Sequence, residues 1–230
     1  MKYFLMWAVL TVCCNGAIAE DARDPWEGFN RKVFAFNDGA DRFVLKPVAK
    51  GYKKVVPNGV RKAVGRFFSN IQYPIVAVNQ LLQGKGKLGL RDSARFLINS
   101  TLGVAGLFDP ARKMGFDEHE EDFGQTFARW GITSGPYLVV PFWGPSTLRG
   151  STGDLADWSV YPPRYLDSEQ LRYSLFLINA IDKRAGLLSA ENLISGDRYE
   201  FFRDAYLQRR DYLIHDGEVE DPFLDDDWEE

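Results

Sequence analysis

Apolar residues recur at helical spacing along most of the chain, and no stretch of any length alternates between apolar and polar residues. The clearest apolar stripe repeats at spacings of four, three, four and three, and it consists of Phe29, Val33, Phe36, Ala40 and Phe43. Such spacing places side chains on one face of an α-helix. The sequence therefore predicts an all-α fold in which this stripe packs against neighbouring helices.

The boundaries of the helices are predicted from capping residues and prolines. In the segment 24–27, Asp24 is the expected N-cap of the first helix, and Lys46-Pro47 is expected to end it. A second, basic helix should follow Pro57 and end at Tyr73-Pro74. Two more apolar stripes, within 171–185 and 199–213, predict the C-terminal helices.

The first 19 residues have the order of a secretory signal peptide. Lys2 precedes an apolar run from Tyr3 to Cys14 that is too short to span a bilayer, and Ala17 and Ala19 frame an A-x-A cleavage site. Both cysteines of the chain lie within that run, in poor contexts for lipoprotein processing. We expect cleavage after Ala19 without acylation; an uncleaved anchor helix and a lipid anchor are the alternatives.

The charge of the chain is uneven. The segment 216–230 holds nine acidic residues and no basic one, against 28 Lys and Arg and 32 Asp and Glu in the whole chain, so the remainder is basic. We expect one helical domain over 20–215 and a disordered acidic tail over 216–230. A basic body suits anionic phosphate, and export favours a lipid headgroup over nucleic acid. The candidates for attracting headgroups are Arg31, Lys46, Arg61, Lys62 and Arg66; the alternative is a solvated helix face.

Two segments have the composition of a membrane-facing surface. The stretch from Asp92 to Phe108 is the most apolar after the signal peptide, and it predicts a helical hairpin that lies in lipid without crossing it. The stretch 135–150 carries three prolines and predicts an irregular aromatic loop at a membrane interface or over the core. The candidate membrane-rim residues are Phe96, Leu97, Leu102, Leu107, Phe108, Tyr137, Phe142 and Trp143.

Signatures of catalysis or cofactor binding are weak. The two histidines are His119, in the acidic segment Asp117–Asp122, and His215, beside the tail; neither sequence context offers an orienting partner. The acidic segment lacks the spacing and glycine of a calcium loop. No G-x-S-x-G motif is present, and the G-x-G-x-x-G match at Gly84–Gly89 follows no strand. We expect no catalytic residues, no metal and no cofactor.

Several ordered blocks of the sequence resemble the MlaA (VacJ) family. The match extends over about 24–217 and includes Asp24-Pro25-Trp26-Glu27-Gly28-Phe29-Asn30-Arg31, Lys46-Pro47-Val48-Ala49, Val78-Asn79, Leu82-Gln83-Gly84, Arg95-Phe96-Leu97-Ile98-Asn99-Ser100-Thr101-Leu102-Gly103, Asp122-Phe123-Gly124-Gln125-Thr126, Gly135-Pro136-Tyr137, Pro141-Phe142, Thr147-Leu148-Arg149, Gly153-Asp154 and Arg203-Asp204-Ala205-Tyr206-Leu207-Gln208-Arg209. Members of this family are commonly lipoproteins. The sequence around Cys13 and Cys14 departs from that pattern, because it fits a lipoprotein-processing site badly.

The resemblance implies a ring of short amphipathic helices in the inner leaflet of the bacterial outer membrane. An amphipathic channel through such a ring would take mislocalised phospholipid from the outer leaflet and pass it to a periplasmic lipid carrier protein, without chemistry. Trimeric porins are the family's usual partners. The competing functions are an exported phospholipid-hydrolysing enzyme and a porin-binding scaffold without a lipid path.

Polar residues beside or within the apolar stripes are the candidates for lining the channel. They are Asn30, Asn37, Asp41, Asn79 and Asn99. A polar group on the flank of a packed helix needs a hydrogen-bond partner or water, and a wet channel would supply the water. The alternative for Asn30 and Asn37 is that both bond neighbouring backbone.

Overall fold

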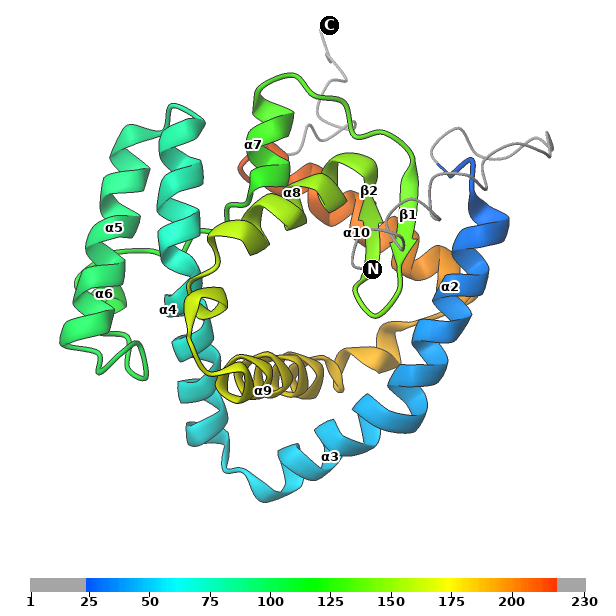
Figure 1. Ribbon diagram of the computed structural model, residues 1–230, viewed down its shortest axis with the longest axis horizontal. Helices are drawn as coiled ribbons and strands as arrows, with labels where there is room; N and C mark the ends of the chain where they lie inside the picture. The colour runs from blue at the N-terminus through cyan, green and yellow to red at the C-terminus, as the bar shows by residue number, and fades with distance from the viewer. Residues whose placement is uncertain (1–23, 219–230) are drawn as a thin grey trace, which may run out of the picture.

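The computed structural model describes residues 24–218, whose helices follow one another around a central opening (Figure 1). In chain order the elements are α2 (Glu27–Ala40), the π-helical turn η1 (Asp41–Leu45), α3 (Lys46–Val55), α4 (Asn58–Leu82), α5 (Gly86–Thr101), α6 (Pro110–Lys113), α7 (Phe123–Arg129), β1 (Tyr137–Val140), β2 (Gly144–Thr147), α8 (Leu148–Val160), the 3₁₀ turn η2 (Pro162–Tyr165), α9 (Glu169–Leu187), the 3₁₀ turn η3 (Ala190–Leu193) and α10 (Arg198–Ile214). The predicted helical fold is confirmed. The signal segment and residues 219–230 of the predicted tail lie outside the described residues.

The first helix does not end where the sequence predicts. The chain passes from α2 through η1 directly into α3, and Pro47 falls in the first turn of α3. A proline is tolerated there because its missing N–H would have no intrahelical partner. The π turn changes the direction of the helix, and it thereby lets α2 and α3 follow the curve of the ring (Figure 1).

The orientation of α2 is the reverse of the prediction. Phe29, Phe36 and Phe43 of the predicted packing stripe are 51%, 52% and 77% exposed, whereas Asn30 is completely buried. Asp24 is also not the predicted N-cap: it is fully buried, and its carboxylate accepts hydrogen bonds from Asn30 (2.7 Å) and the hydroxyl of Tyr199. The helix is therefore attached to the rest of the protein through Asn30 and through Val33 and Phe34, whereas Phe29, Phe36 and Phe43 are directed outward.

The hairpin predicted within Asp92–Phe108 is formed instead by the longer helices α4 and α5, which pack side by side (Figure 1). Pro74 lies inside α4 and does not end it. The second half of the predicted hairpin, 102–108, is an irregular turn. In this turn Gly106 adopts a φ of +87°, and a Cβ there would lie 2.4 Å from Cβ of Asn70, so glycine permits close packing on α4.

A short antiparallel sheet, β1 with β2, occupies the segment predicted to be irregular, with Tyr137 opposite Thr147 and Val140 opposite Gly144. Tyr137 and Val139 form a core cluster with Tyr199 of α10, and Phe34 of α2 packs against it. The proline of β2 is tolerated because the sheet has only two strands, both of which are edges. The hairpin therefore joins α2 to α10 on one side of the ring.

Candidate functional site

A cavity of about 730 Å³ lies between the helices of the ring. Its wall is formed by α4, α8, α9, α10, the start of α7 with the segment before it, and the turn between β1 and β2. The lining side chains include Ser69, Gln72, Tyr73, Ile75, Val76, Glu118, His119, Glu120, Glu121, Asp122, Gln125, Phe142, Trp143, Asp154, Asp157, Trp158, Tyr161, Phe176, Asn179, Ala180, Lys183, Arg209 and Leu213. Carboxylates, amides, aromatic rings and aliphatic groups thus share one cavity that is open to the surroundings.

Helix α8 contributes two carboxylates to this wall. Its N-cap Thr147 accepts a hydrogen bond from the backbone of Gly150 at 3.0 Å, and Asp154 and Asp157 follow three residues apart on one helical face. Burial, reinforced by the negative charge of Asp122, raises the pKa of Asp157 to about 7 and also raises the pKa of Asp154.

The carboxylate of Asp122 differs because it is paired. Arg210 of α10 donates two hydrogen bonds to it, at 2.5 and 3.0 Å, and the carboxylate also accepts the backbone N–H of Gln125 at the start of α7. Burial opposes ionisation of Asp122, but these bonds hold its pKa below the usual range. The pair joins α10 to the start of α7 at the cavity wall.

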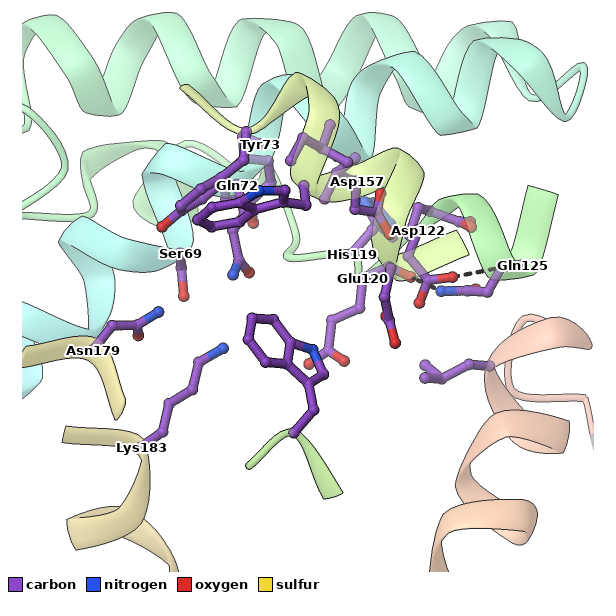
Figure 2. A pocket seen from close by; sticks show the side chains of 18 of the residues that line it. Ser69, Gln72, Tyr73, His119, Glu120, Asp122, Gln125, Asp157, Asn179 and Lys183 are labelled. Atoms are coloured by element: carbon purple, nitrogen blue, oxygen red, sulfur yellow. Dashed lines mark hydrogen bonds between the residues drawn. The ribbon is translucent and has the colours of Figure 1, made fainter. Parts of the chain in front are cut away.

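Helix α9 supplies the opposite side of the cavity. In Figure 2, Asn179 and Lys183 extend into the cavity from one side, whereas Asp122 and Asp157 lie across it. Within residues 24–218, Lys183 forms no hydrogen bond or ion pair. Burial lowers the pKa of its ammonium group, although the negative charge of Glu120 acts in the opposite direction. An ammonium group is therefore available inside the ring.

Aromatic rings provide the apolar part of the cavity. Trp143, in the turn between β1 and β2, stacks on Phe176 of α9, with the ring centroids 5.8 Å apart and the planes 24° apart. Trp158 stacks in the same way on Tyr161, at 6.0 Å and 26°. The space therefore combines charged groups with extended apolar surface, as a site for an amphipathic molecule requires.

The predicted channel-lining asparagines on α2 have another role. Asn30 donates to the backbone oxygen of Tyr137 (3.1 Å) and accepts from the N–H of Val139 (2.9 Å). Asn37, seven residues later, donates to the backbone oxygen of Val140 (3.0 Å) and accepts from the N–H of Phe142 (2.8 Å). Both side chains thus bond neighbouring backbone, as the alternative prediction stated, and they hold strand β1 against α2.

The other three predicted lining residues are also absent from the cavity wall. The carboxylate of Asp41 pairs with Arg184 (2.6 and 2.8 Å). Asn79 accepts a hydrogen bond from Thr126 (2.6 Å), and Asn99 bonds Asp109 (3.0 Å). These polar groups connect helices to their neighbours and are satisfied by protein partners.

The predicted headgroup-attracting residues lie outside the cavity. Arg31 pairs with Glu27, Asp197 and Glu200, and Lys46 pairs with Glu191. On α4, Lys62 and Arg66 are exposed and Arg61 is half-buried. Arg66 borders a second, smaller pocket beside Leu102 and Phe108. The basic charge of these helices therefore lies on the outer surface of the ring.

The predicted membrane-rim residues divide into three groups. Leu97, Leu102, Leu107 and Phe108 are exposed, and Phe96 is half-buried. Tyr137 is completely buried in the core cluster, so its assignment to the rim is wrong. Phe142 and Trp143 are exposed but line the cavity. Within 24–218 no helix combines the length and apolarity needed to cross a membrane.

The acidic segment is also placed differently from the sequence expectation. His119 lines the cavity, and its Nδ1 lies 2.9 Å from Oδ1 of the buried Asp92, so this histidine does have an orienting carboxylate. Within the described part of the chain, no hydroxyl group forms a hydrogen bond with the His119 ring. In the same residues no three His, Cys, Asp or Glu side chains are placed to hold a metal ion.

The cavity residues that sequence reasoning missed lie on α4, α8 and α9 and in the segment before α7. Asp154, Asp157, Trp158 and Tyr161 recur at spacings of three, one and three, which could have identified a polar aromatic face. Lys183 had no such signal, because a lone lysine on a helix is normally solvated. Its position inside the ring depends on how α9 packs against α3 and α4.

Comparison with known proteins supports one family. A family model described as MlaA lipoprotein matches residues 22–213. The intermembrane phospholipid transport system lipoprotein MlaA of Escherichia coli (strain K12) is 34% identical over 220 residues, covering 92% of this chain and 86% of that protein. An uncharacterised protein of Rickettsia typhi is 36% identical over 204 residues, covering 87% and 80%.

The fold is also found among solved structures. A structure from work on the structural basis for maintenance of bacterial outer membrane lipid asymmetry matches with a TM-score of 0.74 and 35% sequence identity, covering 83% of this chain and 98% of that chain. The agreement thus extends from sequence to helix arrangement. The chain belongs to the MlaA lipoprotein family.

Proposed function

We propose that this protein is the outer-membrane component of an intermembrane phospholipid transport system that maintains lipid asymmetry. The observation that carries the proposal is the cavity of about 730 Å³ inside the helical ring, lined by both charged and aromatic side chains. A phospholipid presents a charged headgroup and apolar chains together, and this cavity offers surfaces for both. The E. coli relative belongs to an intermembrane phospholipid transport system, and the structural neighbour comes from work on outer membrane lipid asymmetry, so both support the same conclusion.

The outer surface of the ring suits a membrane. Phe36, Phe43 and Val44 on α2 and η1, and Leu97 and Leu102 near the end of α5, are at least half exposed. Large apolar side chains exposed in such number suit a surface that a membrane or a partner protein covers. The protein would then lie in the inner leaflet of the outer membrane and take phospholipid that has mislocalised to the outer leaflet.

The partners follow from the resemblance. A trimeric porin would cover part of the apolar surface, and a soluble periplasmic carrier would collect lipid from the cavity. The step that we propose is the transfer of intact phospholipid without bond cleavage. We also propose that the signal peptide 1–19 directs export and is cleaved after Ala19 without acylation. The alternative is a lipid anchor, which the description of the family as a lipoprotein favours.

Analysis of lipid bound to the purified protein separates transport from hydrolysis. The protein is incubated with phospholipid vesicles, and the bound and free lipids are extracted and identified by mass spectrometry. Transport predicts intact phospholipid on the protein and no release of fatty acid. Release of fatty acid that disappears in a His119→Ala variant would instead support an enzyme, and a folded protein without bound lipid would support a scaffold.

A further inference from the structure

The charged groups of the cavity fall into paired and unpaired sets. Arg209 pairs with Glu120 at 2.5 Å, and Arg210 pairs with Asp122. Within residues 24–218, neither Asp154 nor Asp157 forms an ion pair. The carboxylate of Asp157 accepts a hydrogen bond from the backbone N–H of Phe123, at 3.3 Å. The unpaired ammonium of Lys183 thus shares the cavity with the unpaired carboxylates of Asp154 and Asp157; the exposed carboxylate of Glu118 also lines the cavity and forms no ion pair within 24–218.

The two carboxylates share a helical face with aromatic rings. On α8, Asp154, Asp157, Trp158 and Tyr161 all line the cavity, and the two rings stack on each other. Carboxylates attract a cation by charge, and the face of an aromatic ring attracts it through the ring quadrupole. This combination of residue types favours an ammonium ligand.

An independent feature of the same region favours an ammonium group that carries N–H donors. Gln125 lines the cavity and is only 3% exposed, and its Oε1 has no hydrogen-bond partner within the part of the chain that the structure describes. Its Nε2 donates to the backbone oxygen of Glu120 at 3.2 Å. A buried acceptor without a partner is costly, so a donor-bearing ligand beside it would be stabilising.

Lys183 lies on the other side of the cavity from this wall (Figure 2). A headgroup that carries both a phosphate and an ammonium group could therefore place the phosphate toward α9 and the ammonium toward α8. A headgroup with the phosphate alone would leave Asp154 and Asp157 uncompensated beside another negative charge. The arrangement of charges distinguishes zwitterionic from anionic lipids.

We propose that the inner face of α8, through Asp154, Asp157, Trp158 and Tyr161, binds the ammonium group of an ethanolamine-type phospholipid headgroup, and that the cavity therefore prefers such lipids to anionic ones. This inference rests on the proposed function, since it specifies which phospholipid the same cavity accepts. The primary ammonium, with its N–H donors, satisfies acceptors that a quaternary ammonium would leave unpaired.

The test uses competition between two lipids. Full-length protein in mild detergent is incubated with vesicles of equal parts phosphatidylethanolamine and phosphatidylglycerol, and the bound lipid is quantified by mass spectrometry. The wild type should carry phosphatidylethanolamine in an excess of about threefold or more over the vesicle ratio, as expected for partly exposed ion pairs. An Asp154→Asn/Asp157→Asn variant should lose this excess and keep the total amount of bound lipid.

Two further variants make the result specific. Lys183→Gln should lower total binding and leave the ethanolamine excess in place, because it removes the contact with the shared phosphate. Asp167→Asn, an exposed carboxylate outside the cavity, should behave as the wild type. If the double variant does not fold, Asp154→Asn alone gives the comparison.

Four outcomes would overturn the inference. Bound lipid at the vesicle ratio in the wild type, or an unchanged excess in the double variant, would refute ammonium selection and leave phospholipid transport intact. When phosphatidylcholine replaces phosphatidylethanolamine in the vesicles, its excess over phosphatidylglycerol on the protein should be smaller. A phosphatidylcholine excess as large as that of phosphatidylethanolamine would refute the role of N–H donors. Absence of any bound phospholipid would contradict the proposed function as well.

Discussion

The reversed orientation of α2 makes a quantitative prediction about Asn30. Replacing Asn30 by leucine, which has nearly the same shape, removes the acceptor for the N–H of Val139 and the donor to the backbone oxygen of Tyr137. It also removes one hydrogen bond to the buried carboxylate of Asp24. Leaving a buried polar group unpaired costs about 1–3 kcal/mol, so Asn30→Leu should lower the free energy of unfolding by about 3–6 kcal/mol. That loss is a large fraction of the stability of a typical domain.

The adjacent residue provides a matched control. Phe29 is 51% exposed, so Phe29→Ala should cost only about 1 kcal/mol, against about 3–5 kcal/mol for a phenylalanine in a core. Both free energies can be measured by denaturant unfolding in mild detergent, followed by circular dichroism. If Phe29→Ala costs more than Asn30→Leu, the aromatic stripe faces the core and the described orientation of α2 is incorrect.

Four other predictions follow from particular contacts. A Cβ at Gly153 would lie 2.4 Å from the backbone nitrogen of Gly124, so Gly153→Ala should lower the melting temperature, with a loss of about 1–3 kcal/mol in the free energy of unfolding. A Cβ at Gly186 would meet no atom within 4 Å, so Gly186→Ala should leave the melting temperature unchanged. Burial raises the pKa of Asp157 from 3.8 to about 7, so its stabilising contribution is complete below the unfolded value and is lost as the pH rises through about 7. Relative to the wild type, Asp157→Asn should gain unfolding free energy between about pH 4 and about pH 7, and a pH-independent difference would contradict this. Leu102→Lys should weaken membrane association measured by vesicle flotation, and unchanged flotation would refute the rim assignment. Mass spectrometry of the mature protein should give an N-terminus at Glu20, and a diacylglyceryl cysteine would contradict cleavage without acylation.

The helical class of the fold could be predicted from the sequence because periodicity depends on local geometry. The same periodicity could not reveal which side of α2 is buried. A stripe such as Phe29–Phe43 is equally compatible with a protein core and with a membrane, and only tertiary contacts distinguish the two. The asparagines looked like flank residues, but Asn30 and Asn37 satisfy the backbone of β1, which lies more than 100 residues away in the sequence.

The prolines were misleading for a related reason. Pro47 and Pro74 were expected to end helices, but one falls in the first turn of α3 and the other is accommodated within α4. The cost of a proline inside a helix, about 3 kcal/mol, can be offset by packing along the rest of a 25-residue helix. The cavity residue Lys183 could not be recognised because its environment is created by closure of the ring.

The most direct test of the proposed transport is to fill the cavity without altering the outer surface. Ala180 of α9 lines the cavity, whereas Ala205 of α10 is exposed outside it. Purified wild type, Ala180→Trp and Ala205→Trp are compared for transfer of labelled phospholipid from donor vesicles to a periplasmic carrier, after circular dichroism establishes that each is folded. Transport through the ring predicts that Ala180→Trp reduces transfer to the rate without protein, while Ala205→Trp transfers at the wild-type rate. Wild-type transfer by folded Ala180→Trp would contradict a lipid path through this cavity.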